Sequence, residues 1–193
     1  MKLKMRCLSM AMLVASISSF ASGVGAVSLA FTPANQSVAL GDPVTFDITI
    51  SGLTSGAAPS LGVYDLDVSF DPGVLAFDSV LFGGLLGEST RDVDDSTPGT
   101  LNLFELSLLD EAELNALQPA TFVLASLTFS TVSVGSTDLV LSVNSLGDGP
   151  GDPLPIDSVG SGSITVVPEP STLTLTAAAV WGLCLCRRRR VKA

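Results

Sequence analysis

The stretch Val44-Thr45-Phe46-Asp47-Ile48-Thr49-Ile50 decides the fold class, because apolar and polar residues alternate along it without a break. Alternation with period two is typical of a β-strand that has one face in a hydrophobic core and the other in water. The pattern returns over Val63–Phe70, where Asp65, Asp67 and Ser69 occupy the polar positions. Both stretches therefore predict strands of a half-buried sheet.

Other segments with strand character extend outward from these two in both directions. Clusters of Gly, Pro, Asp and Ser separate them, and prolines stay out of their interiors, as the ladder hydrogen bonds of a sheet require. About eight short strands predict an all-β fold, a β-sandwich for which the jelly roll is one arrangement. The additional predicted strands are Ser37–Leu40, Val74–Phe82, Leu101–Leu109, Thr121–Val134, Leu139–Val143 and Ser163–Val167.

One short helix is predicted between two of these strands. Asp110 can cap its first turn, Glu113 stands three residues later as in a capping box, and Pro119 ends it. At helical spacing, Leu114 and Leu117 would face inward.

The charges are segregated along the 193 residues, and this excludes nucleic acid as a partner. Between Asp42 and Asp157 there are eighteen acidic residues against the single base Arg91, a net charge of −17. A phosphate backbone would be repelled by such a surface. Bound cations, or solubility in a salty exterior, fit this charge better.

The central region also lacks the residues that most catalytic sites use. The three cysteines, Cys7, Cys184 and Cys186, lie near the chain ends, and there is no histidine. A disulfide, a thiolate nucleophile, a thiolate zinc site and every His-dependent mechanism are therefore excluded there. We expect no enzyme and no cofactor.

The N-terminus has the features of a signal peptide over residues 1–26. Lys2, Lys4 and Arg6 precede an apolar run of about ten residues, Leu8–Ile17, which is too short to span a bilayer. Cleavage is expected after Ala26, with a site after Ala21 as the alternative; a retained N-terminal anchor is a second alternative.

The C-terminus has three parts in order: Val167-Pro168-Glu169-Pro170, an uncharged stretch over 171–186, and a basic cluster. As a helix, the stretch would extend about 24 Å, against a hydrocarbon core of about 30 Å. The cluster should stay cytoplasmic, because basic residues that flank a span are retained on that side. Its arginines are Arg187, Arg188, Arg189 and Arg190.

This tail, residues 167–193, resembles the PEP-CTERM sorting signal of Gram-negative and related bacteria. The resemblance implies recognition and cleavage by an exosortase-like membrane protease, and an association with exopolysaccharide and biofilm. A permanent tail anchor is the alternative.

Residues 27–166 form the predicted domain, and two of its runs are similar to a cohesin domain. They are Gln36–Ile48, with its Gly-Asp-Pro entry to a strand, and Leu66–Phe77, where Asp71-Pro72 is followed by Val74-Leu75. Leu124–Phe129 fits a later cohesin strand. The resemblance implies a nine-stranded jelly roll, related to carbohydrate-binding modules, that binds a dockerin through one sheet face.

The densest acidic cluster is a candidate calcium site. Asp92, Asp94 and Asp95 lie in a predicted polar loop, where carboxylates can supply several of the six to eight oxygens that calcium takes. A solvated loop is the alternative. The same two interpretations apply to Asp148 and Asp152, and to Asp157, in a Gly/Pro-rich loop.

Two functions remain open for the exported domain. The first is a structural or adhesive module of the cell surface or extracellular matrix, with a protein partner. The second is a carbohydrate-binding module for matrix polysaccharide, with calcium as its one conceivable cofactor. Scarce aromatics argue against the second, since Trp181 lies in the tail and Tyr64 is expected in the core. We expect an exported protein, at least transiently anchored in the membrane by its C-terminal span.

Overall fold

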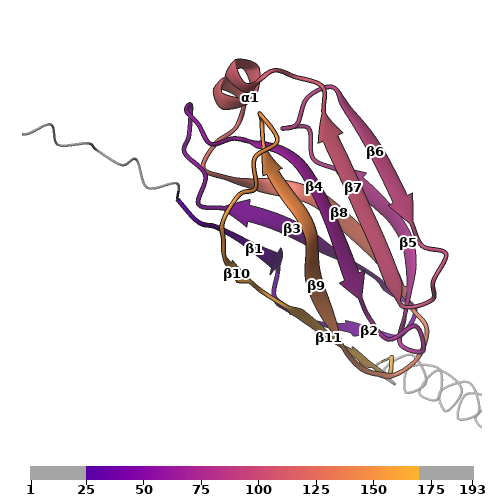
Figure 1. Ribbon diagram of the computed structural model, residues 1–193. Coiled ribbons are helices and arrows are strands. Elements are labelled where there is room, and N and C mark those ends of the chain that lie inside the picture. Colours follow the sequence, from indigo (N-terminus) through magenta and orange to yellow (C-terminus); the bar gives the residue numbers. More distant parts are fainter. Residues whose placement is uncertain (1–24, 170–193) are drawn as a thin grey trace, which may run out of the picture.

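A computed structural model describes residues 25–169, which form a sandwich of two β-sheets with one short helix at one end (Figure 1). The predicted signal peptide up to residue 24, and the tail from residue 170, lie outside the described residues. The all-β sandwich predicted from the sequence is confirmed. Figure 1 shows β9, β4, β7 and β6 side by side, with β1, β3 and β8 crossing behind them.

The two sheets contain five and six strands. The five-stranded sheet has the order β10 (Ile156–Val159), β1 (Val27–Thr32), β3 (Pro43–Ser51), β8 (Thr121–Thr131), β5 (Leu75–Phe82). The six-stranded sheet has the order β2 (Asn35–Ala39), β11 (Gly162–Val167), β9 (Gly135–Asp148), β4 (Leu61–Ser69), β7 (Thr100–Ser107), β6 (Ser89–Asp94).

The core lies between the sheets and is built by the alternation seen in the sequence. On β3 the apolar members of the alternating stretch are buried, and on β4 Tyr64, Leu66 and Val68 are buried while Asp65 and Asp67 lie on the opposite face. Each fully buried Leu, Ile or Phe side chain contributes about 1.5–3 kcal/mol by leaving water. Packing of these two faces therefore supplies the main driving force for the fold.

The first two and the last two strands of the described domain close one side of the sandwich, because each pair places one strand in each sheet. β1 and β10 pair in parallel in the five-stranded sheet, and β2 and β11 pair in parallel in the six-stranded sheet. Because each end of the domain contributes one strand to each sheet, the two sheets cannot separate on this side without breaking both parallel pairs.

A buried carboxylate holds the opposite side. Glu105 on β7 has no exposed surface and accepts hydrogen bonds from the Tyr64 hydroxyl (2.8 Å), Ser89 Oγ (2.7 Å) and Arg91 Nε (2.8 Å). The Arg91 guanidinium also lies over the Phe82 ring of β5, 5.3 Å from its centroid, and donates to the Gly83 carbonyl. Edge strands β6 and β5, which belong to different sheets, are joined in this way.

The environment of Tyr64 follows from this arrangement. Burial, and then the neighbouring Glu105 carboxylate, raise the pKa of the Tyr64 phenol far above its usual value, so the phenol stays a hydrogen-bond donor. Three donors, one of them cationic, compensate the desolvation of Glu105.

The helix α1 (Glu111–Leu117) begins as predicted. The Asp110 carboxylate accepts from the Glu113 amide, and the Glu113 side chain accepts from the Asp110 amide, a complete capping box. Leu114 is buried, but the inward orientation predicted for Leu117 is wrong, since that side chain is 41% exposed. Gln118 is buried instead, and its amide bonds both backbone groups of Leu61 (2.7 Å each).

Three strands, β1, β6 and β10, were not predicted from the sequence. β6 was predicted as a loop, and this is wrong for Asp92 and Asp94, which lie in the strand. Its inward positions are Ser89, Arg91 and Val93, so the apolar alternation that marks a strand is absent. β10 is exposed along its whole length and has no buried face to leave a pattern.

Glu105→Ala should destabilise the domain clearly. It removes the acceptor of three hydrogen bonds and leaves the buried Tyr64 hydroxyl with only its long contact to the Leu124 carbonyl (3.4 Å), and a buried polar group that loses its partner costs about 1–3 kcal/mol. Urea unfolding monitored by circular dichroism measures the change. Glu88→Ala is the matched control, because Glu88 is exposed and should change the free energy of unfolding by less than about 0.5 kcal/mol. Equal effects of the two substitutions would contradict this role for Glu105.

Candidate functional site

The outer face of the six-stranded sheet carries a cluster of four polar side chains from three adjacent strands, which we call the outer-face quartet. Its members are Asp65 and Asp67 on β4, Asn102 on β7 and Asn144 on β9. The Asn102 amide donates to Asp65 (2.7 Å) and Asp67 (2.8 Å), and the Asn144 amide donates to the same two carboxylates (3.1 and 3.0 Å). Four hydrogen bonds therefore fix the quartet.

The hydrogen bonds of the quartet offset the repulsion between the carboxylates of Asp65 and Asp67. Two carboxylates two residues apart on one strand face repel each other. Each asparagine bridges them, so the amide dipoles relieve the repulsion while the net charge of −2 remains. Arg91, the one basic residue in the described part of the chain, is bonded to Glu105 (2.8 Å), so it does not neutralise this face.

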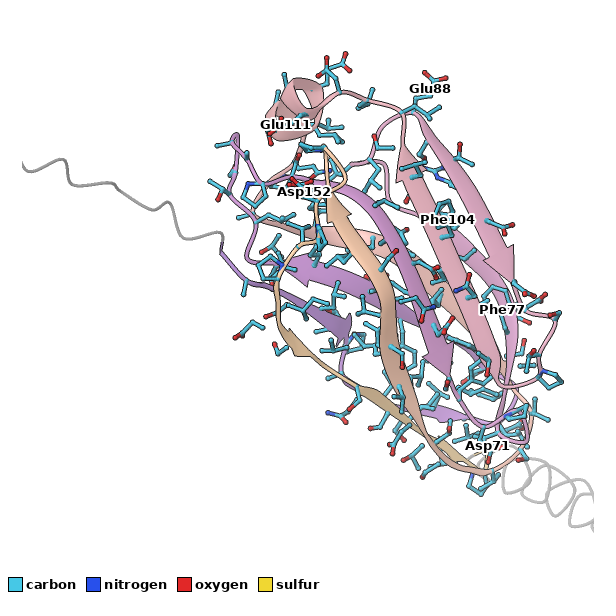
Figure 2. All side chains as sticks on the ribbon, viewed as in Figure 1. Asp71, Phe77, Glu88, Phe104, Glu111 and Asp152 are labelled. Carbon is cyan, nitrogen blue, oxygen red and sulfur yellow. The ribbon has the colours of Figure 1, made fainter. Side chains whose placement is uncertain are left out.

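Apolar side chains border the quartet. Phe104 on β7 is the cross-strand partner of Asp65, and Leu106, which is 40% exposed, is the partner of Val63. Figure 2 shows Phe104 on the front strands, away from the helix α1. A half-buried aromatic and an exposed leucine beside paired hydrogen-bonding groups give this face both polar and apolar contacts.

Phe104 was not singled out from the sequence as a residue of this face. Leu101 and Leu103 are buried, so residue 104 falls on the outward side of β7. The alternation of the buried leucines would have located it. No sequence pattern marked Asn102 and Asn144 as site residues, because only the pairing of β7 and β9 with β4 brings them beside Asp65 and Asp67.

The predicted calcium ligands lie at the edge of the same face. Asp92 and Asp94 on β6 are the cross-strand partners of Phe104 and Asn102, and Asp95 follows the strand. Hydrogen bonding by Ser96 lowers the pKa of the Asp94 carboxyl. Within residues 25–169 no three acidic side chains converge closely enough to form a metal-binding group. Calcium binding by Asp92, Asp94 and Asp95 stays a prediction.

The other acidic candidates have separate positions. Asp148 ends β9, and its carboxylate accepts the backbone N–H groups of Gly151 (3.0 Å) and Asp152 (2.7 Å), which stabilises a tight turn. Asp157 lies exposed on β10. None of these three is brought to the outer-face quartet.

The sorting motif straddles the boundary of the described residues. Pro168 and Glu169 are exposed and directly follow β11, whereas Pro170 and Arg187, Arg188, Arg189 and Arg190 lie outside the described residues. Over residues 25–169, no helix has the length and apolar character that a membrane crossing requires. The span predicted at 171–186 lies outside that range.

The arrangement of residues 25–169 defines a class of protein, a β-sandwich whose two packed sheets are closed on one side by parallel strands. The family model of the cohesin domain matches residues 29–166. The chain belongs to the cohesin domain family, and the predicted resemblance is confirmed. Among curated proteins, none matches this chain.

Solved structures show the same fold at low sequence identity. The cohesin CaCohA2 from Clostridium acetobutylicum is 23% identical, with a TM-score of 0.59 over 74% of this chain and 92% of that one. A non-cellulosomal cohesin from the archaeon Archaeoglobus fulgidus is 17% identical, with a TM-score of 0.58 over 77% and 96%. The cohesin OlpA from Clostridium thermocellum, solved with the dockerin Doc918, is 10% identical, with a TM-score of 0.60 over 74% and 99%.

Proposed function

We propose that this protein is a non-enzymatic adhesion or scaffolding module that binds a protein partner through the outer face of its six-stranded sheet. The observation that carries the proposal is the outer-face quartet with its border of Phe104 and Leu106. Fixed polar groups and exposed apolar groups side by side are typical of protein interfaces.

Family membership supports a protein as the ligand. A structural relative from Clostridium thermocellum was solved as a cohesin–dockerin complex. By analogy, the proposed partner is a dockerin-like domain. The identity is low, so the fold is shared while the partner must be recognised by the side chains of this chain.

The charge of the domain defines the chemistry of that partner. Residues 25–169 contain all nineteen acidic residues and one base, and that base is bonded to Glu105. A partner surface with Lys or Arg side chains would gain electrostatic attraction, mainly as a faster association rate at low salt.

One observation favours a second candidate, a carbohydrate-binding module for matrix polysaccharide. Phe104 lies beside Asp65 and Asn102, and an aromatic ring next to carboxylates and amides suits a sugar ring and its hydroxyl groups. Calcium at Asp92, Asp94 and Asp95 would belong to this candidate.

We also propose that the protein is exported and sorted through its PEP-CTERM-like tail. The structure supports an abrupt transition from domain to tail: the Val167 carbonyl at the end of β11 still accepts from the Leu40 amide (2.9 Å), and Pro168 follows at once. An exosortase-like protease would then act beside the folded domain. Delivery to the cell surface or extracellular matrix follows from this proposal.

Asp67→Lys should abolish partner binding if the outer face is the interface. A like-charge contact with a basic partner, together with loss of the quartet, is expected to weaken affinity by at least about a hundredfold, about 2.7 kcal/mol. Biolayer interferometry with a panel of dockerin domains, and with partners captured from exported proteins, measures it.

Asp47→Lys is the matched control for that experiment, because Asp47 also lies on a strand but on the five-stranded sheet. Its affinity should stay within about twofold of the unchanged protein, a difference of less than 0.5 kcal/mol. Equal losses for both substitutions would show a general charge effect and would contradict the outer face as the interface.

A glycan array decides between the two candidates. If the ligand is a protein, the array should retain no glycan, with or without a calcium chelator, because the quartet would then contact a protein surface. Specific retention of one polysaccharide that Phe104→Ala abolishes would establish the second candidate. Loss of retention on chelation, and in Asp95→Asn, would place calcium at the predicted ligands.

The mass of the mature C-terminus tests the sorting proposal. Removal of the tail predicts that intact-protein mass spectrometry of exported material finds a chain that lacks Arg187 to Arg190. Recovery of a chain that still ends at Ala193 would contradict processing and leave an uncleaved tail.

A further inference from the structure

Strand β9 changes its neighbours halfway along its length. Residues 135–139 pair with β11, ending at Leu139 opposite Gly162. Residues 140–148 pair with β4 on the other side, beginning at Val140 opposite Ser69. β9 therefore belongs to two ladders that overlap little, and its second half lacks the β11 neighbour.

The free edge of this second half is bounded at both ends. Further along, the Leu154 amide donates to the Leu146 carbonyl (2.9 Å) and the Asp148 amide to the Asp152 carbonyl (2.9 Å). Between these contacts and Leu139, residues 140–145 have no backbone ladder on the side away from β4 among the described residues. In a strand, alternate residues direct their N–H and C=O groups to that side, so this edge presents unpaired donors and acceptors.

A groove lies at one end of this edge. It has a volume of about 360 Å³ and is lined by Val143, Asn144 and Leu146 from β9, and by Pro153, Leu154 and Ile156 from the chain leading into β10. Ile156 is 41% exposed, so its side chain offers apolar surface beside the groove. The groove thus offers apolar contacts next to an unpaired strand edge.

The charge around the groove has one sign. Asp152 lies between the lining residues Gly151 and Pro153, and Asp65 is the cross-strand partner of Ser145, which also lines the groove. The single base of the described residues is bonded to Glu105 and offers no compensation here. Charge complementarity therefore selects a basic occupant.

We propose that the edge of β9 at residues 140–145 binds an extended basic peptide segment of a partner, which adds a short strand beside β9. Main-chain hydrogen bonds to the edge supply affinity, one apolar side chain fills the groove against Val143 and Ile156, and Lys or Arg side chains are attracted by the acidic surface around the groove, which includes Asp152. The site goes beyond the proposed function, because it uses a strand edge in place of the outer face of the sheet.

The test uses the purified full chain and a labelled probe peptide, Lys-Val-Thr-Val-Lys-Val. Fluorescence anisotropy should show saturable binding, and amide hydrogen exchange of residues 140–145 should slow at least about fivefold when the peptide is present, since paired amides exchange slowly. The control peptide has the same sequence with every internal amide N-methylated. It keeps the charge but cannot donate, and it should bind at least about tenfold more weakly, 1.4 kcal/mol.

Two substitutions on β10 provide matched protein variants. Ile156 and Val159 are equally exposed, at 41%, but only Ile156 lines the groove. Ile156→Lys should weaken peptide binding at least about tenfold, whereas Val159→Lys and Phe104→Ala should stay within about twofold. Absence of binding, equal affinity for the N-methylated peptide, or unchanged exchange at residues 140–145 in the unsubstituted protein would each overturn the proposal.

Discussion

Glu105 is the constraint on which the rest of this sandwich depends. A carboxylate without solvent contact must be compensated, and here Tyr64, Ser89 and Arg91 compensate it from three positions around β7. The consequence extends to the surface. Because the one base within residues 25–169 is bonded to Glu105, no other carboxylate of the domain has a basic partner within these residues. The ion pair of Arg91 and Glu105 thus stabilises the edge of the sandwich and leaves the other acidic side chains without a basic partner within residues 25–169.

Features that depend on one continuous segment could be predicted from the sequence, whereas features that depend on how strands pair could not. The alternation over Val44–Ile50 and the capping box at Asp110 and Glu113 are local, and both were predicted correctly. β6 was missed because Arg91 occupies an inward position that an apolar residue usually takes. The outer-face quartet depends on the register between β4, β7 and β9, which is set by residues up to 79 positions apart. No single segment contains that information.

Shape and chemistry have diverged to different extents in this family. Structural relatives with 10–23% identity keep the two-sheet arrangement over about three quarters of this chain. The fold needs only buried faces of the right period, which many sequences supply. Recognition needs particular side chains at particular places, such as the amides that bridge Asp65 and Asp67. On a scaffold shared with these relatives, the proposed recognition of a partner would depend on the surface residues of this chain.

The junction between β11 and Pro168 has a mechanical consequence. Val167 is still part of the sheet, and Pro168, whose ring restricts the backbone, follows it directly. It leaves at the end of the sandwich where Asp71 lies (Figure 2), opposite the helix α1. Whatever immobilises the residues after Pro168 would also limit how far the domain can swivel. The broad faces would then be presented sideways, toward neighbours in the same layer, while α1 would form the distal tip.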